Sequence, residues 1–285
     1  MKLLNSIKQI SFLKSVKRRY LSIRKKSLDF LRVKWIKSFY FNFKMFSFKT
    51  AVKLPVLFYG KVKFSSLKGK IIINAPIAKG MVKFGYNLEI IKKAIGVSEL
   101  KIDGTFIING NFFTGVDYAL IILRGGIFEI GENSHLGSKI KIIVTKKVIL
   151  GKYFRLSFES QIFDSNFHYM LDTEKNEVNR LDGEIIMNDY CWVGNRSTIM
   201  RNTITPRYTT IASNSLLNKD YTTEIPEKSI IGGMPAKLIK KNMSRVYDPK
   251  QEAIISDYFD SHPKEQVYKV RPDFLDGITP RTLHV

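Results

Sequence analysis

The chain has 285 residues, 44% of them apolar, which is enough for one large domain or two small ones with a sizeable core. Its single cysteine, Cys191, excludes an internal disulfide framework. The formal net charge of +22 is concentrated in residues 1–50, which hold fourteen lysines and arginines against one acid. Such a balance is typical of proteins with an anionic partner, such as a membrane surface, a nucleic acid or a charged glycan, although a solvated basic segment has the same composition.

Residues 1–50 are predicted to form a basic, amphipathic helical extension. Two sets of apolar residues recur at helical spacing: Leu13, Val16, Tyr20 and Ile23, and then Leu28, Leu31, Trp35 and Phe39. Most lysines and arginines lie elsewhere on the helical wheel. A helix of this kind binds anionic lipid or docks its apolar face on the rest of the protein. We expect docking, and we keep contact of residues 1–45 with the inner face of an anionic membrane as the alternative.

The sequence shows no sign of export or of a membrane-spanning segment. Lysines and arginines repeatedly interrupt the N-terminal region, so it lacks the apolar core of a signal peptide. Nowhere is there an apolar run of the ~20 residues that a transmembrane helix needs. A single cysteine fits a reducing compartment. We therefore expect a soluble, cytoplasmic protein.

The stretch from residue 51 to 240 consists of short strands, and from about residue 106 it follows a six-residue repeat. Residues 51–105 hold β-prone runs punctuated by glycines, which we interpret as leading strands and first coils. From residue 106 onward, apolar residues recur at every sixth position. The triplets are Ile130, Leu136 and Ile142; Leu150, Leu156 and Ile162; Met187, Val193 and Ile199; Thr205, Ile211 and Leu217; and, more faintly, Ile108, Thr114 and Leu120.

A period of six fits neither a helix nor the plain alternation of one strand. It fits a solenoid in which each short strand turns one apolar residue inward and ends at a corner, with three strands to a coil. Small residues follow many repeat positions, for instance Gly131, Gly151 and Gly194, and we interpret them as corners that need positive φ. The coils of residues 106–240 form the predicted main domain.

One long excursion interrupts the repeat, and a turn-rich segment closes it. Residues 169–185 are rich in Asp, Glu, Asn and Arg and are predicted to be a loop that contacts a ligand, with a disordered insertion as the alternative. After Leu217, the glycines and prolines up to residue 240 predict a cap on the open end of the solenoid. Residues 241–285 are predicted to form a charged tail with a short helix.

Three segments resemble those of the hexapeptide-repeat acyltransferases. Residues 162–168 resemble the Asp-x-x-x-His catalytic stretch of that family. Residues 188–194 resemble its Gly-Asp-Asn-x-Trp-Ile-Gly coil, and residues 233–240 resemble its Gly-Asn-Pro-Ala-Lys-x-Ile terminal signature. The likeness spans about residues 100–242 and is greatest to the maltose/galactoside and surface-polysaccharide O-acetyltransferases.

This resemblance implies a mainly β fold, a left-handed parallel β-helix that assembles as a homotrimer with active sites between subunits. It also implies transfer of an acyl group, most often acetyl from acetyl-CoA, to a hydroxyl of a saccharide in the biosynthesis of a surface polysaccharide or other glycan, with no metal required. The chain departs from the family pattern at Thr205 and Pro206 and at Ser213 and Asn214. Relatives contact the donor through the backbone of those coils, so the departures bear on donor affinity and identity.

Moving an acyl group from a thioester to a hydroxyl needs a base, and the unperturbed pKa of histidine suits that task. Of the four histidines, only His168 ends a coil and opens a long polar loop, and it falls on the six-residue count after Ile162. With the resemblance, His168 is the predicted general base, and a solvent-exposed corner histidine is the alternative. Asp164 is predicted to orient its ring, with Glu159 and backbone carbonyls as other candidates. His135 is interpreted as an outward residue on a coil face.

The resemblance also assigns a donor site. By position, the matching residues are Trp192, Asn195, Ser213, Lys219, Lys237 and Lys240. The first three are expected to lie along the pantetheine arm of CoA, and the lysines to contact the phosphates at its nucleotide end. Packing at a subunit interface is the alternative for the tryptophan, and plain solvent exposure is the alternative for the lysines.

Other functions fit parts of the sequence. A metal hydratase on the same solenoid, like the γ-class carbonic anhydrases, needs three histidine ligands with a close pair, whereas His135 and His168 lie 33 residues apart. A non-catalytic solenoid that binds glycan or membrane is favoured by the altered small residues and the basic N-terminus. We expect no specific nucleic-acid partner, because no zinc module, RNA-recognition motif or aromatic-basic ladder is visible.

Overall fold

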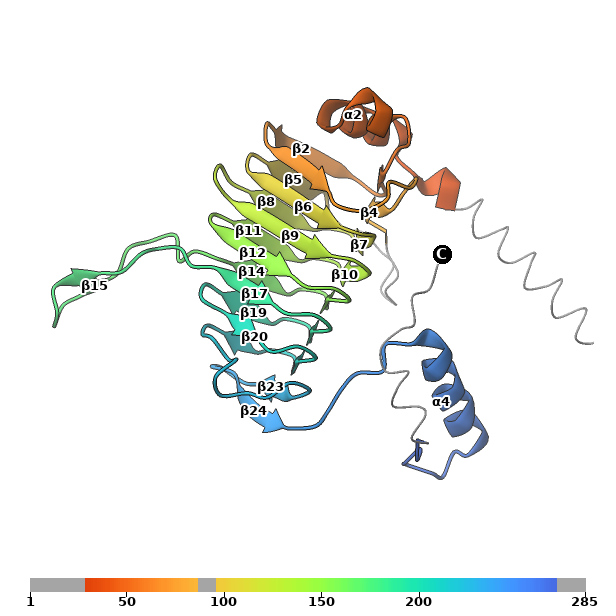
Figure 1. Cartoon of the computed structure of the whole chain (residues 1–285), viewed down its shortest axis with the longest axis vertical. Coiled ribbons are helices and arrows are strands. Elements are labelled where there is room, and N and C mark those ends of the chain that lie inside the picture. The colour runs from red at the N-terminus through yellow and green to blue at the C-terminus, as the bar shows by residue number, and fades with distance from the viewer. Residues whose placement is uncertain (1–28, 87–95, 271–285) are drawn as a thin grey trace, which may run out of the picture.

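The centre of the protein is a three-sided parallel β-solenoid, which a computed structural model describes for residues 29–86 and 96–270 (Figure 1). Each coil runs through three sheets in turn, and strands of successive coils pair in parallel. The mainly β, parallel β-helix fold predicted from the repeat is confirmed. Some of the predicted features lie outside the described residues. They are the helical stripe from Leu13 to Ile23, residue Leu28 of the second stripe, and the part of the tail beyond residue 270.

Within the described residues, the strands form three long sheets, each of which follows one side of the solenoid from end to end. In spatial order, the first sheet holds β1 (Val56–Phe58), β4 (Val82–Phe84), β7 (Phe112–Thr114), β10 (Ser134–Leu136), β13 (Arg155–Leu156), β18 (Trp192–Val193), β21 (Thr210–Ile211), β23 (Ile230–Gly232) and β24 (Lys237–Lys240). The second sheet holds β2 (Val62–Leu67), β5 (Ser98–Ile102), β8 (Ala119–Ile122), β11 (Lys141–Val144), β14 (Gln161–Phe163), β19 (Thr198–Met200) and β22 (Leu216–Leu217). The third sheet holds β3 (Lys70–Ile73), β6 (Thr105–Asn109), β9 (Ile127–Gly131), β12 (Lys147–Leu150), β17 (Ile185–Met187) and β20 (Ile204–Thr205).

The six-residue repeat places one column of buried side chains under each sheet. Cross-strand pairing stacks Leu136, Leu156, Val193 and Ile211 under the first sheet; Ile142, Ile162, Ile199 and Leu217 under the second; and Ile130, Leu150, Met187 and Thr205 under the third. All twelve are at most 2% exposed. The hydroxyl of Thr205, the polar member, lies 3.4 Å from the Cys191 sulfur, so this polar group has a partner inside the core.

The small residues that follow the repeat positions allow close approach between coils, and positive φ falls elsewhere. A Cβ added at Gly131 would lie within 2.5 Å of backbone atoms of the next coil, and one at Gly194 within 2.6 Å. Positive φ occurs two residues later, at Asn133 (55°), Tyr153 (55°) and Arg196 (58°). The prediction that these glycines supply positive φ was therefore wrong. Each corner therefore has two separate requirements: a small residue where the next coil lies close, and a left-handed backbone conformation two residues later. The six-residue pattern does not distinguish these two positions.

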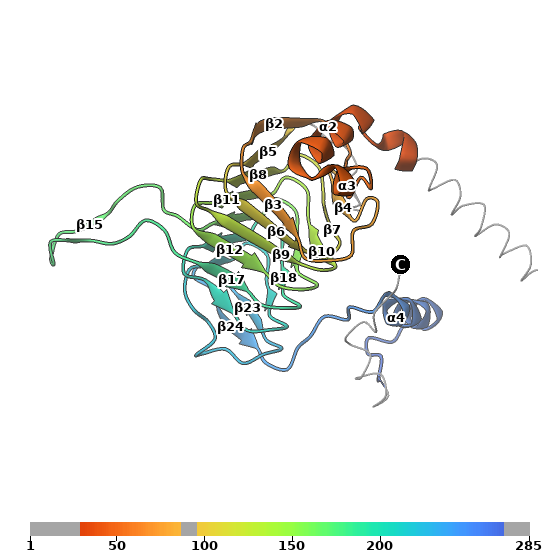
Figure 2. The same cartoon turned by 45° about the horizontal axis from the view of Figure 1, so that its top comes forward.

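Helix α2 (Trp35–Met45) covers the N-terminal end of the solenoid and is followed by the short helix α3 (Phe48–Ala51) (Figure 2). The Phe41 ring is fully buried, with its centroid 5.0 Å from that of Phe58. The side chain of Asn42 donates to the Val56 carbonyl at 2.7 Å and accepts from the Val56 N–H at 3.2 Å. Docking on the solenoid, expected for the extension as a whole, is thus what α2 does.

The docked face of α2 is not the stripe that the sequence predicted. The buried residues are Ser38, Phe41 and Asn42, whereas Leu31 and Phe39 of the predicted stripe are 76% and 46% exposed. The reason is that the end of the solenoid presents free backbone groups of β1 as well as apolar surface. Ser38 and Asn42 satisfy those groups by hydrogen bonds, and a pattern that counts only apolar residues misses such a face.

The other end of the solenoid is closed by β24, which runs antiparallel to β23, so the predicted cap is confirmed. The tail then leads to α4 (Pro249–Ser261), whose N-cap residue Asp248 accepts a hydrogen bond from the Lys250 N–H. No residue of α4 is buried, and Figure 1 shows it standing apart from the coils. A search of the described residues finds no helix with the length and hydropathy to cross a bilayer.

Candidate active site

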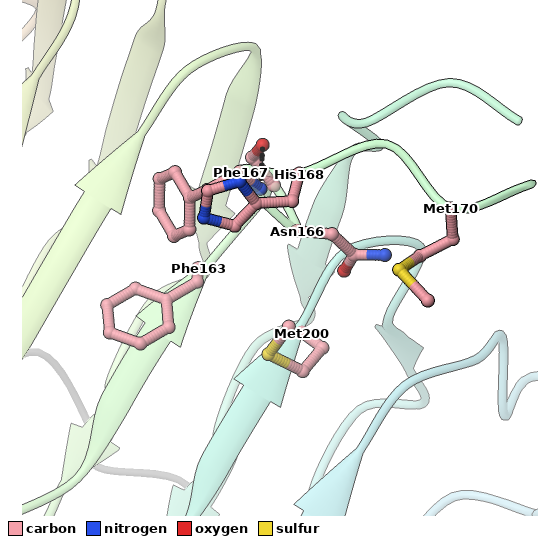
Figure 3. Close-up of a pocket in the computed structure, with 7 residues that line it drawn as sticks. Phe163, Asn166, Phe167, His168, Met170 and Met200 are labelled. Carbon is pink, nitrogen blue, oxygen red and sulfur yellow. Dashed lines mark hydrogen bonds between the residues drawn. The ribbon is translucent and has the colours of Figure 1, made fainter.

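His168 lies at the corner where the chain leaves β14 of the second sheet before it reaches the third. Its side chain is exposed and faces a hollow of about 450 Å³ (Figure 3). The hollow is also lined by Phe163, Ser165, Asn166, Phe167, Met170 and Met200. An imidazole with free access to solvent thus stands beside an apolar wall, an arrangement that suits a base acting at the edge of a binding groove.

Asp164 anchors this corner from inside the solenoid. Its side chain is fully buried, and its carboxylate accepts from the Thr145 N–H (2.8 Å), the Thr145 hydroxyl (2.7 Å), and the N–H groups of Lys146 (2.7 Å) and Lys147 (2.8 Å). Both oxygens are therefore engaged with the turn of the preceding coil. The structure gives Asp164 partners other than the imidazole, and Glu159 lies at the far end of β14, paired with Arg196 at 2.9 Å.

The structure shows where His168 lies relative to the repeat. It falls on the six-residue count after Ile162, at the point where the repeat breaks. The chain turns out of the solenoid after Asp164, and the inward position of the third sheet is filled by Met187, which pairs with Leu150. The agreement with the six-residue count is a coincidence of numbering. His168 is accessible because it lies outside the core.

Beyond the corner, the excursion forms a hairpin that projects away from the solenoid (Figure 1). Its strands are β15 (Leu171–Asp172) and β16 (Glu177–Val178), which pair antiparallel. The base of the hairpin is closed by a bridge between Ser165 and Asp182 and by the Asn166 N–H donating to the Leu181 carbonyl at 3.0 Å. The excursion is thus an ordered hairpin that begins at the histidine corner, with no need for the alternative of a disordered insertion.

Phe163 and Met200 are candidate site residues that the sequence analysis missed. They are cross-strand neighbours on the outward side of the second sheet, and both line the hollow. The signal was present, because each is an apolar residue directly after an inward isoleucine, Ile162 or Ile199. A pattern that counts every sixth position does not see the outward positions between.

The predicted donor residues Trp192, Asn195 and Ser213 gather at the corner between the first and second sheets. Trp192 is outward on β18, is 37% exposed, and donates its Nε1–H to the Ser157 hydroxyl at 3.2 Å. The Ser213 hydroxyl donates to the Asn195 side-chain oxygen at 2.6 Å, one coil below. These three side chains form a polar edge beside one aromatic face.

The predicted phosphate contacts do not form one cluster. Lys237 and Lys240 are exposed on β24 at the closing end of the first sheet. Lys219 follows β22 at the corner between the second and third sheets, where it pairs with Glu224 at 2.6 Å. Lys219 therefore lies at the same corner of the solenoid as His168, away from the other two lysines.

Within one chain, His168 and the donor residues lie at opposite ends of the second sheet. His168 follows β14 at its exit, whereas Asn195 precedes the entry to β19, the neighbouring strand. The width of the sheet separates them, so a single protomer does not bring base and donor residues together. A groove containing both needs the histidine corner of one chain beside the donor corner of another.

A second column of polar and aromatic side chains lies on the outer face of the first sheet, and the tail packs against part of it. Cross-strand pairing aligns Phe113, His135, Arg155 and Trp192. The guanidinium of Arg245, from the tail, lies 5.0 Å from the Trp192 ring centre. Burial, together with the charges of Arg155 and Arg245, lowers the pKa of His135 to about 4. His135 is outward on its coil, as predicted, and is neutral near pH 7. Among the described residues, no group of three or more His, Cys, Asp or Glu could hold a metal ion.

The chain resembles known proteins at low sequence identity. No family model matches the sequence. The chain is 23% identical over 147 residues to WbbJ of Escherichia coli K12, a protein assigned to lipopolysaccharide biosynthesis as an O-acetyltransferase, and the match covers 49% of this chain and 73% of WbbJ. Among solved structures, the polySia-specific acetyltransferase NeuO aligns over 76% of this chain and 91% of its own, with 18% identity and a TM-score of 0.43. The polysialic acid O-acetyltransferase OatWY aligns over 70% of this chain and 100% of its own, with 14% identity and a TM-score of 0.39.

The coils, the signatures and the sequence match all resemble those of one family. The stacked columns build the solenoid that the six-residue repeat requires. Residues 162–168 end at the exposed histidine corner, residues 188–194 carry the outward tryptophan, and residues 233–240 form the closing strand. With the match to WbbJ, these features make the chain similar to the hexapeptide-repeat acyltransferases.

Proposed function

We propose that the protein is an acyl-CoA-dependent O-acyltransferase that acetylates a hydroxyl of a saccharide in the biosynthesis of a surface polysaccharide or other glycan. The observation that supports this most is the exposed imidazole of His168 at a coil corner, facing a hollow of about 450 Å³ where the chain leaves the solenoid. In the proposed reaction, His168 accepts the proton of the attacking hydroxyl. The hydroxyl oxygen forms the new ester bond as the carbon–sulfur bond of the thioester breaks. The imidazolium then returns its proton to the thiolate that leaves.

Asp164 acts in this proposal as a positioning residue. Its four hydrogen bonds fix the last residue of the solenoid before the corner, so they fix the point from which His168 projects. The donor would lie with its pantetheine arm along Trp192, Asn195 and Ser213. These residues suit the pantetheine arm, because the outward ring of Trp192 lies beside the polar side chains of Asn195 and Ser213 at one corner of the solenoid.

A saccharide acceptor is supported by the hairpin and by the relative. The hairpin starts at the histidine corner, and its residues between 172 and 182 are largely charged or amide-bearing, which suits the many hydroxyl groups of a sugar. WbbJ is assigned to lipopolysaccharide biosynthesis, and an acceptor of the same chemical class is proposed for this chain.

Acetyl-CoA is expected to stabilise the protein and to be consumed only with a suitable acceptor. At a concentration of about 100 Kd, the donor should raise the midpoint of thermal unfolding by about 5 °C or more. With a panel of saccharides, release of free CoA thiol should depend on the acceptor and should match formation of an acetyl ester. If millimolar acetyl-CoA leaves the unfolding midpoint unchanged and no saccharide supports thiol release, the non-catalytic solenoid that binds glycan or membrane becomes the better interpretation.

A homotrimer is proposed because the base and the donor residues of one chain are held apart. The outer face of the third sheet offers a surface for assembly, since Ile149, Ile186 and Ile204 are successive outward neighbours there. All three are half-buried in the single chain, so an apolar ladder is left at the surface beside the histidine corner. Packing of this face against the donor corner of a neighbouring chain would place the histidine corner of one chain beside the donor residues of the next.

Replacing Ile149 and Ile186 by lysine is expected to dissociate the assembly. Two charges on each copy of an apolar interface carry a desolvation cost that the contact cannot offset. Analytical ultracentrifugation should show the mass fall from trimer to monomer, and thiol release should fall with it. Ile230→Lys, on the outer face of the first sheet, is the matched control and should stay trimeric. A double variant that keeps the wild-type mass would contradict this interface.

A further inference from the structure

The face of α2 that points away from the solenoid is apolar. Ile36, Phe39, Tyr40 and Phe43 are 86%, 46%, 56% and 47% exposed. They stand at positions i, i+3, i+4 and i+7, so they form one stripe, which we call the outer stripe, opposite the docked face of the same helix. A helix with one face in the core and four large apolar residues on the other face has a surface that calls for a partner.

The outer stripe continues onto α3. The Phe48 side chain is 75% exposed, and its ring centroid lies 6.0 Å from that of Phe43. Val52, directly after α3, is 51% exposed. Trp35 borders the other end, with its ring 6.0 Å from that of Phe39. The apolar surface therefore spans both helices at the end of the solenoid.

Positive charge surrounds this surface. The exposed lysines of the segment are Lys34, Lys37, Lys44, Lys49 and Lys53. Asp29 is the sole acidic residue in the sequence from 1 to 53, and residues 1–28, which lead into α2, add nine lysines and arginines with no acid. The surface thus pairs apolar side chains with cations, the combination that binds the interface of an anionic bilayer.

We propose that the outer stripe docks on an anionic lipid membrane. A second copy of the chain suits this face poorly, because two such segments would bring like charges together. A nucleic acid would use the lysines but would leave Ile36 and Phe43 exposed to water. Figure 1 shows α2 at the end of the solenoid, away from the hairpin strand β15, so docking would leave the corner where the hairpin begins open.

Full-length protein is expected to cosediment with vesicles of phosphatidylcholine containing phosphatidylglycerol, and much less with phosphatidylcholine alone. Changing Ile36, Phe39 and Phe43 together to glutamine should weaken partitioning on the order of tenfold or more, because their apolar burial is lost. Lys37→Glu with Lys44→Glu should weaken it comparably and remove the preference for anionic vesicles. Ile254→Gln, an exposed helical site on α4, is the matched control and should bind as wild type.

The two tryptophans allow a direct probe of contact. In a Trp192→Phe background, Trp35 is the remaining tryptophan, and its fluorescence should shift to the blue when anionic vesicles are added. Unchanged vesicle binding by the triple glutamine variant would overturn the proposal. So would loss of self-association in that variant without any vesicle binding by wild type, which would assign the stripe to a second copy. Acetyl transfer to a water-soluble saccharide should remain at wild-type level in the triple variant, so this test fails or succeeds independently of the proposed function.

Discussion

Replacing His168 by alanine is expected to reduce acyl transfer by a factor of about 10²–10⁴ while leaving the fold intact. The loss follows from removing the group that accepts the hydroxyl proton. The fold is spared because the side chain is exposed and lies outside the stacked columns. Steady-state thiol release with a saccharide acceptor measures the first effect, and the thermal unfolding midpoint measures the second.

His262→Ala is the matched control, because that histidine is also exposed but ends α4, outside the coils. It should keep wild-type turnover. Donor binding gives a further separation, since the rise in unfolding midpoint with acetyl-CoA should survive in His168→Ala. Wild-type turnover in His168→Ala would remove the base from the proposed reaction.

Replacing Asp164 by alanine is expected to cost about 3–5 kcal/mol of unfolding free energy, the largest stability effect that we predict. The substitution leaves the N–H groups of Thr145, Lys146 and Lys147 without their acceptor at a buried corner, at about 1–3 kcal/mol for each unsatisfied group. The midpoint of thermal unfolding should fall by about 10 °C or more. The unfolding free energy of Asp164→Asn should lie between those of wild type and Asp164→Ala. The asparagine keeps one acceptor oxygen but turns an N–H₂ group toward backbone donors.

The control is Asp257→Ala, a change at an exposed position of α4, which should stay within about 0.5 kcal/mol of wild type. Acyl transfer by the Asp164 variants should fall together with stability and recover in part at low temperature. An Asp164→Asn protein that unfolds like wild type yet transfers no acetyl group would instead assign the carboxylate a direct role at the imidazole.

The sequence was a good guide wherever a single requirement determined a position. The only requirement at each sixth residue is an apolar side chain that fills the core. Leu136, Ile162 and Val193 could therefore be placed in their columns in advance. It was a poor guide where two requirements meet. Gly194 follows a repeat position because the next coil lies close, while the left-handed turn falls on Arg196, whose side chain carries no signature of that φ.

Some residues of the candidate site stood out in the sequence, but their arrangement did not. His168 stood out by its place before a polar loop, and Trp192 by its signature. The sequence did not indicate that Asp164 would turn inward to the preceding coil, because its partners are backbone N–H groups, which every residue type except proline provides. Nor did it indicate that base and donor residues occupy different corners. That separation depends on which sheet each strand joins, and the period is the same for all three sheets.

The stacking of coils also determines how far the histidine corner lies from the helix-covered end of the solenoid. Along the second sheet, four strand-to-strand steps lead from β2, next to the helix-covered end, to β14, where the histidine corner begins. At ~4.8 Å per step this is about 19 Å. If α2 rests on a bilayer, the reacting hydroxyl of a lipid-tethered glycan has to stand at least that far above the headgroups. Shorter tethered sugars would be out of reach, and inserting or deleting a coil would change the minimum length of acceptor by one step.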